Sequence, residues 1–332
     1  MPLTASTRVA GTRTCAVTLE MLRAAARVLD GVAVRTPLLD SPDLGARVGA
    51  PVALKCELLQ PIGAFKIRGA YHAVSRLVAR GGARGVVTAS SGNHGQAIAF
   101  AASRFGLRAV VVMPESTPQV KIDGVRRHGG EVVLAGATRS VEQGARADAI
   151  SRDEALVMIP PFDHVDVITG QGTIGLEILE QRPDVRTILV PVSGGGLLAG
   201  ISAAVAALAP HVRVVGVEPA GAAKLTAALA AGAPTALPHT ESMADGLLSR
   251  SVGELTFSIL RDVVRESVTV SEAQIAAAVR YLHRHAELRP EPSGAVAVAA
   301  LLAGRVHVEG PTVAVVSGGN VDPDLYQRLV AE

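Results

Sequence analysis

The chain has 332 residues, enough for two domains, and a net charge near +2 with no basic tract, which argues against a nucleic-acid partner. Hydrophobic residues make up 48% and aromatic residues only 2%, so the core has to be built mainly from Ala, Val, Leu and Ile. No stretch approaches the ~18 apolar residues of a membrane span, and no apolar run typical of a signal peptide is present, so we expect a soluble, cytoplasmic protein. Cys15 and Cys56 are expected to be reduced thiols, with Cys56 in the core.

Taken in chain order, the pattern predicts a loose tail over 1–16 and a helix over 18–30, and then strands alternate with Ala-rich helices. Strands are expected at 51–58, 85–89, 108–113, 130–134, 155–159, 186–192, 212–218, 266–270 and 311–316. Helices are expected at 67–80, 93–105, 118–128, 138–151, 170–181, 196–208, 222–231, 271–287 and 293–303. This alternation predicts parallel sheets covered on both faces, and nine strands favour two sheets. The pattern alone would divide the chain near residue 160, where two prolines interrupt it.

Lysine is rare in this chain, since only four of the 32 basic residues are lysines, and the others are arginines. Unlike arginine, a lysine can lose its charge on burial and act as a base or as a Schiff-base nucleophile. Lys66, in GAFKIRGA (63–70), lies at a predicted strand-to-helix turn, where open α/β sheets place their ligands. Lys55 and Lys121 are expected to lie on the solvated surface.

Three turns rich in small residues follow predicted strands: TASSGNHGQA (88–97), PVSGGGLLAG (191–200) and VVSGGN (315–320). Such turns let the backbone approach a ligand, and a helix N-terminus attracts anions, so we expect the three turns to converge on one ligand. The second turn also fits the dinucleotide pattern at Gly194, Gly196 and Ala199, with Glu218 about 20 residues further on. From this turn alone, an NAD-dependent oxidoreductase and a phosphate-only site both stay open.

Six motifs occur in a characteristic order: QPIGAFKIRGA, SSGNHGQAIA, GQGTIGLEIL, PVSGGGLLAG, EPSGAVAVAALL and SGGNVD. Together they resemble the fold-type II pyridoxal-phosphate enzymes, in particular the serine/threonine dehydratase (ammonia-lyase) and serine racemase branch. The resemblance implies an α/β fold like that of the tryptophan synthase β chain, with two domains that each contain a mostly parallel sheet flanked by helices. It replaces the division near 160 by a large cofactor-binding domain (1–68 plus 163–332) and a small inserted domain (69–162). It also implies a homodimer without the C-terminal regulatory domain of the long threonine dehydratases.

The resemblance also assigns roles to individual residues. Lys66 would bind pyridoxal 5'-phosphate covalently and carry the Cα proton, and Phe65 and Asn93 would hold the cofactor ring. Ser317 would hydrogen-bond the pyridine nitrogen. Ser91 would face the opposite side of the substrate from Lys66. Backbone N–H groups would hold the phosphate at Ser193, Gly194, Gly195, Gly196 and Leu197. The substrate carboxylate would be bound at Ser90, Ser91, Gly92, Asn93 and His94.

One departure from the family pattern concerns metal binding. Metal-activated relatives bind a divalent ion through a glutamate, a backbone carbonyl and an aspartate, and the corresponding positions here are Glu218, Ala222 and Lys224. An oxygen-ligand site cannot accept an ammonium group as its third ligand, so we expect no divalent cation or only weak binding. Our hypothesis is that the Lys224 ammonium replaces the ion by pairing with Glu218.

The activity that the resemblance implies is β-elimination on L-threonine or L-serine, a small hydroxy amino-acid substrate, with release of a 2-oxo acid and ammonia. A serine racemase or a 3-hydroxyaspartate ammonia-lyase is the near alternative, because IPPFDHVDVITGQGT (159–173) also resembles that branch. An NAD-dependent oxidoreductase is the distant alternative, and the presence of both Lys66 and Ser91 disfavours a catalytically silent amino-acid-binding protein. Five histidines show no metal-ligand spacing and are expected at the surface: His211, His239, His283, His285 and His307.

Overall fold

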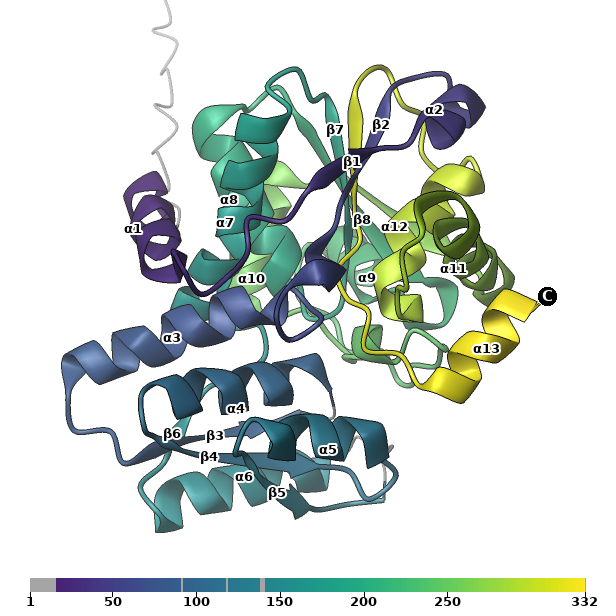
Figure 1. Ribbon diagram of the computed structural model, residues 1–332. Coiled ribbons are helices and arrows are strands. Elements are labelled where there is room, and N and C mark those ends of the chain that lie inside the picture. Colours follow the sequence, from purple (N-terminus) through teal and green to yellow (C-terminus); the bar gives the residue numbers. More distant parts are fainter. Residues whose placement is uncertain (1–15, 91, 118, 138–140, 332) are drawn as a thin grey trace, which may run out of the picture.

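The computed structural model describes residues 16–90, 92–117, 119–137 and 141–331, so Cys15 and Ser91 lie outside the described residues. Ten strands form two sheets, one of six strands in the order β1-β2-β10-β7-β8-β9 and one of four in the order β5-β4-β3-β6 (Figure 1). The strands are β1 (Leu38–Asp40), β2 (Val52–Lys55), β3 (Gly85–Ala89), β4 (Arg108–Met113), β5 (Glu131–Leu134), β6 (Val157–Met158), β7 (Thr187–Pro191), β8 (Arg213–Pro219), β9 (Glu266–Val270) and β10 (Thr312–Val315).

The helices cover both sheets, as the alternating pattern predicted. The α-helices are α1 (Leu19–Leu29), α2 (Pro42–Val48), α3 (Lys66–Arg80), α4 (Asn93–Arg104), α5 (Gln119–Arg127), α6 (Val141–Asp153), α7 (Val165–Gln181), α8 (Gly196–Leu208), α9 (Lys224–Ala231), α10 (Glu254–Val263), α11 (Glu272–Ala286), α12 (Pro292–Leu302) and α13 (Pro323–Ala331). Short 3₁₀ helices are η1 (Glu57–Leu59), η2 (Ala220–Ala222) and η3 (Asp245–Leu247). Among the residues described, no helix combines the length and the apolar character needed to cross a bilayer.

The six-stranded sheet is parallel except for β1, which pairs antiparallel with β2. Leu189 lies opposite both Val215 and Ala314, and these three side chains belong to the core under α11 and α12. Their neighbours Ile188 and Val214 point to the other face and join the core under α7 and α8. Side chains that alternate between two buried faces explain why these strands read as almost unbroken apolar runs.

The four-stranded sheet is fully parallel, and all its strands come from the segment between β2 and β7 of the larger sheet. Val86 of β3 packs with Ile98 of α4 on one face, and Val87 packs with Ile150 of α6 on the other. Helix α3 lies between the two layers in Figure 1, and its Ile67 shares a core with residues of α4 and α7. Two parallel-sheet domains are therefore confirmed.

The elements that the pattern missed are short or rich in small residues. β1, α2, α10 and α13 were not expected, and α7 begins at Val165 instead of residue 170. His164 precedes that helix, and its Nδ1 accepts a hydrogen bond of 3.2 Å from the N–H of Asp166. Gly172 lies inside α7, where a Cβ atom would meet the backbone of Gly200 in α8. Glycine at this position permits the close contact between the two helices. The missed residues 165–169 contain no glycine, and four of the five are β-branched, which favours a strand over a helix in the sequence.

Candidate active site

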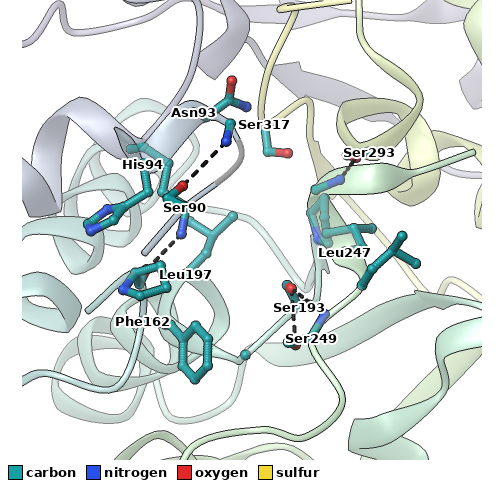
Figure 2. A pocket seen from close by; sticks show the side chains of 18 of the residues that line it. Ser90, Asn93, His94, Phe162, Ser193, Leu197, Leu247, Ser249, Ser293 and Ser317 are labelled. Carbon is teal, nitrogen blue, oxygen red and sulfur yellow. Dashed lines mark hydrogen bonds between the residues drawn. The ribbon is translucent and has the colours of Figure 1, made fainter. Parts of the chain in front are cut away.

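The carboxyl ends of β3, β7 and β10 and the first turn of α3 surround a cavity of about 470 Å³ (Figure 2). All three small-residue turns therefore reach the same cavity, as the sequence predicted. Among the residues that line it are most of the predicted site residues: Phe65, Lys66, Ser90, Gly92, Asn93, His94, Ser193, Gly194, Gly195, Gly196, Leu197 and Ser317. Ser91 belongs to the first turn but lies outside the residues that the structure describes.

Lys66 is the first residue of α3 and is half-buried at the cavity wall. Its Nζ donates a hydrogen bond of 2.7 Å to the carbonyl oxygen of Pro161, in the segment that leads back to the larger sheet. Burial lowers the pKa of Lys66 to about 8, because no opposite charge compensates for the lost hydration. About a tenth of this amine is therefore uncharged at pH 7, and the uncharged form is the one that nucleophilic attack requires.

The backbone just before Lys66 is tied to the turn after β10. The N–H of Phe65 donates a 3.1 Å hydrogen bond to the carbonyl oxygen of Ser317, and Ala64 forms a β-bridge with Gly318. Ser317 lines the cavity and is 4% exposed. The reactive amine and the Ser317 hydroxyl are thus held at neighbouring positions by main-chain bonds.

The turn after β7 forms an anion cradle. Gly195 has φ 95°, in the left-handed region that favours glycine, and a Cβ atom there would lie 3.1 Å from Thr256. A Cβ atom on Gly194 would collide with the ring of Phe162. Helix α8 begins at Gly196, so the N–H groups of its first turn point out of the helix end at the cavity. These groups and the helix dipole favour a bound phosphate.

Two residues of the turn after β3 have their side chains fixed by the backbone. The Ser90 Oγ accepts hydrogen bonds from the N–H groups of Gly92 at 3.4 Å and Gly95 at 3.2 Å, so it caps the start of α4. His94 is 2% exposed, and its Nε2 lies 3.1 Å from the carbonyl oxygen of Ile159. Because a carbonyl can only accept, the hydrogen of the imidazole is on Nε2.

The imidazole of His94 is neutral, because burial lowers its pKa to about 3 and the nearby Lys66 charge acts in the same direction. Its Nδ1 is an acceptor without a hydrogen-bond partner among the described residues. A carboxylate ligand would therefore have to bind at backbone N–H groups of this turn and not at the imidazole, because Nδ1 and a carboxylate both accept hydrogen bonds.

Two residues that hold the Asn93 side chain were not predicted, although both lie in the motifs quoted above. The Asn93 Nδ2 donates to the Glu291 Oε1 at 2.6 Å, and the Asn93 Oδ1 accepts from the Asn320 Nδ2 at 2.8 Å. Glu291 belongs to EPSGAVAVAALL and Asn320 to SGGNVD. Together they fix the orientation of the Asn93 amide at the cavity, a long-range relationship that the motif letters do not reveal.

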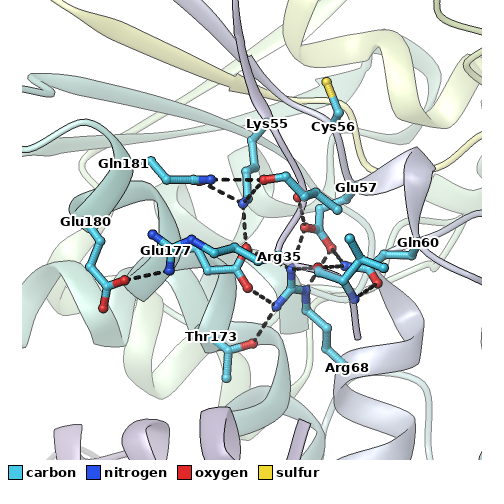
Figure 3. A network of polar contacts seen from close by, with 12 residues as sticks. Arg35, Lys55, Cys56, Glu57, Gln60, Arg68, Thr173, Glu177, Glu180 and Gln181 are labelled. Carbon is cyan, nitrogen blue, oxygen red and sulfur yellow. Dashed lines mark hydrogen bonds and ion pairs between the residues drawn. The ribbon is translucent and has the colours of Figure 1, made fainter. Parts of the chain in front are cut away.

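The prediction that Lys55 and Lys121 lie on the surface was wrong. Lys55 is fully buried, and its Nζ donates to Glu177 at 2.5 Å as part of a buried charge network around Arg68 (Figure 3). Lys121 is 8% exposed and forms an ion pair with Asp245. The five histidines expected at the surface are all exposed, and Cys56 is buried as predicted.

The dinucleotide alternative fails on the position of Glu218. This carboxylate is fully buried and accepts from the N–H groups of Leu225 at 2.8 Å and Thr226 at 3.0 Å, outside the cavity. It is therefore occupied at the start of α9 and is not presented to a ribose. Within the described ranges, no group of three or more His, Cys, Asp or Glu side chains is arranged to hold a metal ion.

The residues of the cavity fit pyridoxal phosphate. They offer an amine with a lowered pKa and a helix N-terminus preceded by glycines for the phosphate. When bound, this cofactor would be held by Lys66 and by the turn that begins at Ser193. The side chain of Ser193 is held in place by a hydrogen bond of 3.1 Å from its Oγ to the Ser249 Oγ (Figure 2).

Comparison with known proteins agrees with this fit. A family profile described as "Pyridoxal-phosphate dependent enzyme" matches residues 29–318. The chain is 45% identical over 290 residues to an L-threonine ammonia-lyase of Geobacter sulfurreducens, a match that covers 87% of this chain and 72% of the relative. An L-threonine ammonia-lyase of Thermotoga maritima is 41% identical, with 95% and 78% covered.

Solved structures agree as well. Maize serine racemase superposes with a TM-score of 0.90 at 36% identity and covers 95% of this chain and 98% of its own. The T.th. threonine deaminase has a TM-score of 0.87 at 40% identity, with 92% and 99% covered. The chain therefore belongs to the family of pyridoxal-phosphate dependent enzymes, in its fold-type II branch.

Proposed function

We propose that this protein is an ammonia-lyase that uses pyridoxal phosphate to remove the β-hydroxyl group of L-threonine or L-serine. The products are a 2-oxo acid and ammonia, which form when the released enamine hydrolyses in water. The observation that carries the proposal is Lys66, whose amine has a pKa lowered to about 8 and faces the same cavity as the anion cradle. The names of relatives at 40–45% identity, L-threonine ammonia-lyase and putative threonine dehydratase, support the reaction class.

The cofactor, when bound, supplies an electron sink that makes the Cα hydrogen of an amino acid acidic. Lys66 Nζ is the proposed covalent attachment point and then the base that takes this proton. The backbone N–H groups from Ser193 to Leu197 hold the phosphate, and Phe65 packs against the ring. Ser317 offers the ring nitrogen a neutral hydroxyl instead of a carboxylate, which limits the strength of the sink. A weaker sink favours loss of a β-leaving group over transamination.

The substrate carboxylate is proposed to bind at the start of α4, near Ser90, Gly92, Asn93 and His94, where the helix dipole favours an anion. Ser91, which the structure does not describe, is proposed to act on the face of the substrate opposite Lys66. Two proton-transferring groups on opposite faces make both Cα configurations accessible. Serine racemisation is therefore the second candidate activity, and the likeness to maize serine racemase favours it.

A substrate panel tests the proposal. The purified enzyme is expected to be yellow, to be trapped in a reduced form by borohydride, and to release 2-oxo acid from L-threonine or L-serine. Lys66→Ala should abolish both trapping and turnover, and Lys66→Arg is the matched control that keeps a cation without a nucleophilic amine. Full turnover in either variant would overturn the assignment.

Chiral analysis of serine after incubation separates the two candidate activities. Racemisation should appear as D-serine, whereas elimination consumes serine without inversion. Ser91→Ala is expected to reduce racemisation more than elimination, because only inversion needs a proton on the second face. Equal losses of both activities would contradict the two-face arrangement.

Further properties implied by the resemblance also belong to this proposal. The boundaries of the inserted domain, 69 and 162, are supported by the four-stranded sheet, whose strands all lie between residues 85 and 158. A homodimer and a cytoplasmic location stay predictions. Sedimentation velocity and cell fractionation test them.

A further inference from the structure

Lys224 is a charged group that the proposed chemistry does not use. It is the first residue of α9, its side chain is fully buried, and it is absent from the lining of the cavity. Burying an ammonium group is unfavourable unless hydrogen bonds and an opposite charge replace its water. The surroundings of Lys224 should therefore show what the charge is for.

Three backbone carbonyls and one carboxylate surround the Lys224 Nζ. It donates to the carbonyl oxygens of Ala222 at 2.7 Å, Leu247 at 3.0 Å and Val192 at 3.1 Å. The Glu218 Oε1 lies 3.4 Å away. An ammonium group has three hydrogens, so the carbonyls use all its donors, while Glu218 supplies the balancing charge.

Glu218 is also fully occupied. Besides the N–H groups of Leu225 and Thr226, its Oε2 accepts from the Thr226 Oγ1 at 2.9 Å and the Ser267 Oγ at 3.2 Å. The pair therefore links β8, the start of α9 and β9 within the larger sheet. Neither partner is available to bind a substrate.

Two of the three carbonyls belong to two separate segments that border the cavity. Val192 immediately precedes the glycine turn that forms the anion cradle, and Leu247 lines the cavity at the end of η3. Beyond Leu247, the Ser249 hydroxyl meets the Ser193 hydroxyl, so the two segments touch a second time (Figure 2). The Lys224 ammonium thus connects the residue before the cradle, Val192, with Leu247 of the cavity lining.

Three carbonyls and a carboxylate are the oxygen ligands that a hard divalent cation takes, at 2.0–2.6 Å. Here the centre of that set is the Lys224 nitrogen itself, so the residues do not fit the divalent ion that the resemblance offered. We propose that Lys224 is a positioning residue whose ammonium acts as a tethered cation, which holds the phosphate cradle in shape without a bound metal. This inference rests on the proposed cofactor.

The test compares holoenzymes in EDTA and in magnesium. In the wild type, cofactor affinity and kcat should agree within about twofold between EDTA and magnesium, and the melting temperature within about one degree. Lys224→Met should bind pyridoxal phosphate at least tenfold more weakly, with no recovery in magnesium. Lys224→Asp should resemble Lys224→Met in EDTA but recover cofactor affinity and melting temperature in magnesium, because aspartate restores an oxygen ligand.

Lys55→Met is the matched control. Lys55 is equally buried and also faces a carboxylate, Glu177, but it contacts no wall of the cavity, so its loss should lower the melting temperature and leave cofactor affinity unchanged. If Lys224→Met does not fold, Glu218→Gln gives the same test, with weaker cofactor binding expected.

Two outcomes would overturn the inference: severalfold activation of metal-stripped wild type by magnesium, or wild-type cofactor affinity in Lys224→Met. Cofactor affinity is measured without any substrate. The inference on Lys224 can therefore still be tested if the protein does not catalyse the proposed ammonia-lyase reaction. A wild type that binds no cofactor would overturn both proposals.

Discussion

Replacement of Arg68 tests whether the buried charge network in Figure 3 holds α3 against η1 and α7. The Arg68 guanidinium is 2% exposed and donates to both oxygens of Glu57 at 2.8 Å and to Glu177 at 2.6 and 3.0 Å. Arg68→Met removes every donor but keeps an unbranched apolar side chain. Loss of one partner of a buried ion pair destabilises a protein by roughly 3–5 kcal/mol, because the other charge stays buried.

The expected change in melting temperature follows from the size of the chain. An unfolding entropy of about 2.1 cal/mol/K per residue gives about 0.7 kcal/mol/K for this chain, so the loss corresponds to about 4–7 °C. The assay is thermal unfolding of the holoenzyme at pH 7.5. Arg35→Met is the matched control, because the Arg35–Glu180 pair is 53% and 64% exposed. Such a surface pair contributes about 0–1 kcal/mol, or less than about 1.5 °C.

The pH dependence provides a second check. Burial alone would raise the pKa of Glu57, but the charge and hydrogen bonds of Arg68 outweigh it and hold this pKa below its usual value. In the wild type, Glu57 therefore contributes stability above the unfolded pKa and loses it as the pH falls. In Arg68→Met, burial raises the pKa of Glu57 and is opposed only by the Thr36 hydrogen bond and the Lys55 charge. Glu57 therefore takes up a proton more readily than in the wild type, and the cost of burying its charge shrinks in acid. The gap in melting temperature should narrow from pH 7.5 to pH 5; a constant gap, or one no larger than that of Arg35→Met, would refute the reasoning.

Three further predictions concern the cavity. Because burial lowers the pKa of Lys66 to about 8, cofactor uptake by the apoenzyme should accelerate as the pH rises through 8, and a flat stopped-flow profile would contradict this. Gly195→Ala should weaken cofactor binding at least about tenfold, because it strains the backbone of the cradle. Gly232→Ala is the control, since Gly232 has φ 71° but open space around it and lies outside the cradle. Titrations followed by cofactor absorbance should therefore show unchanged binding in Gly232→Ala. Glu291→Ala should release the Asn93 amide, shift the cofactor absorbance and lower kcat about tenfold or more. Glu291→Gln can still accept the hydrogen bond and should retain most activity. Equal effects of the two variants would exclude a role of Glu291 in orienting Asn93.

The sequence predicted best those elements whose signals are local. The helix at 196–208 and the strands at 85–89 and 108–113 have the expected bounds, because serine or proline follows each apolar run within two residues. The convergence of the three turns was also predictable, since carboxyl ends of parallel strands meet at one edge of a sheet. The alternation of strands and helices alone did not predict that the four-stranded sheet lies between β2 and β7 in the chain, because it does not reveal which strands pair. The division at 69–162 came from the family resemblance and stays a prediction.

Contacts between residues far apart in the sequence explain why the positions of the buried lysines and the contacts of Asn93 were not predicted. Lys55 looked like a surface residue because its partner Glu177 is 122 positions away, on α7. The roles of Glu291 and Asn320 likewise depend on contacts with Asn93 across 198 and 227 positions. Local patterns carry no information about such pairs, so buried charges in this chain became visible only in three dimensions.

The difference between Lys66 and the other buried lysines is a matter of partners more than of burial. Burial lowers the pKa of all three lysines, but Glu177 opposes this effect at Lys55 and Glu218 opposes it at Lys224, so in each of these pairs an acidic group favours the ammonium. Among the described residues, the hydrogen-bond acceptor of Lys66 is a carbonyl, and no carboxylate lies within ion-pair distance. A carboxylate there would stabilise the ammonium and suppress the free amine. The missing acid therefore makes Lys66 reactive, and an aspartate or glutamate introduced beside it should silence the site while leaving the other lysines unchanged.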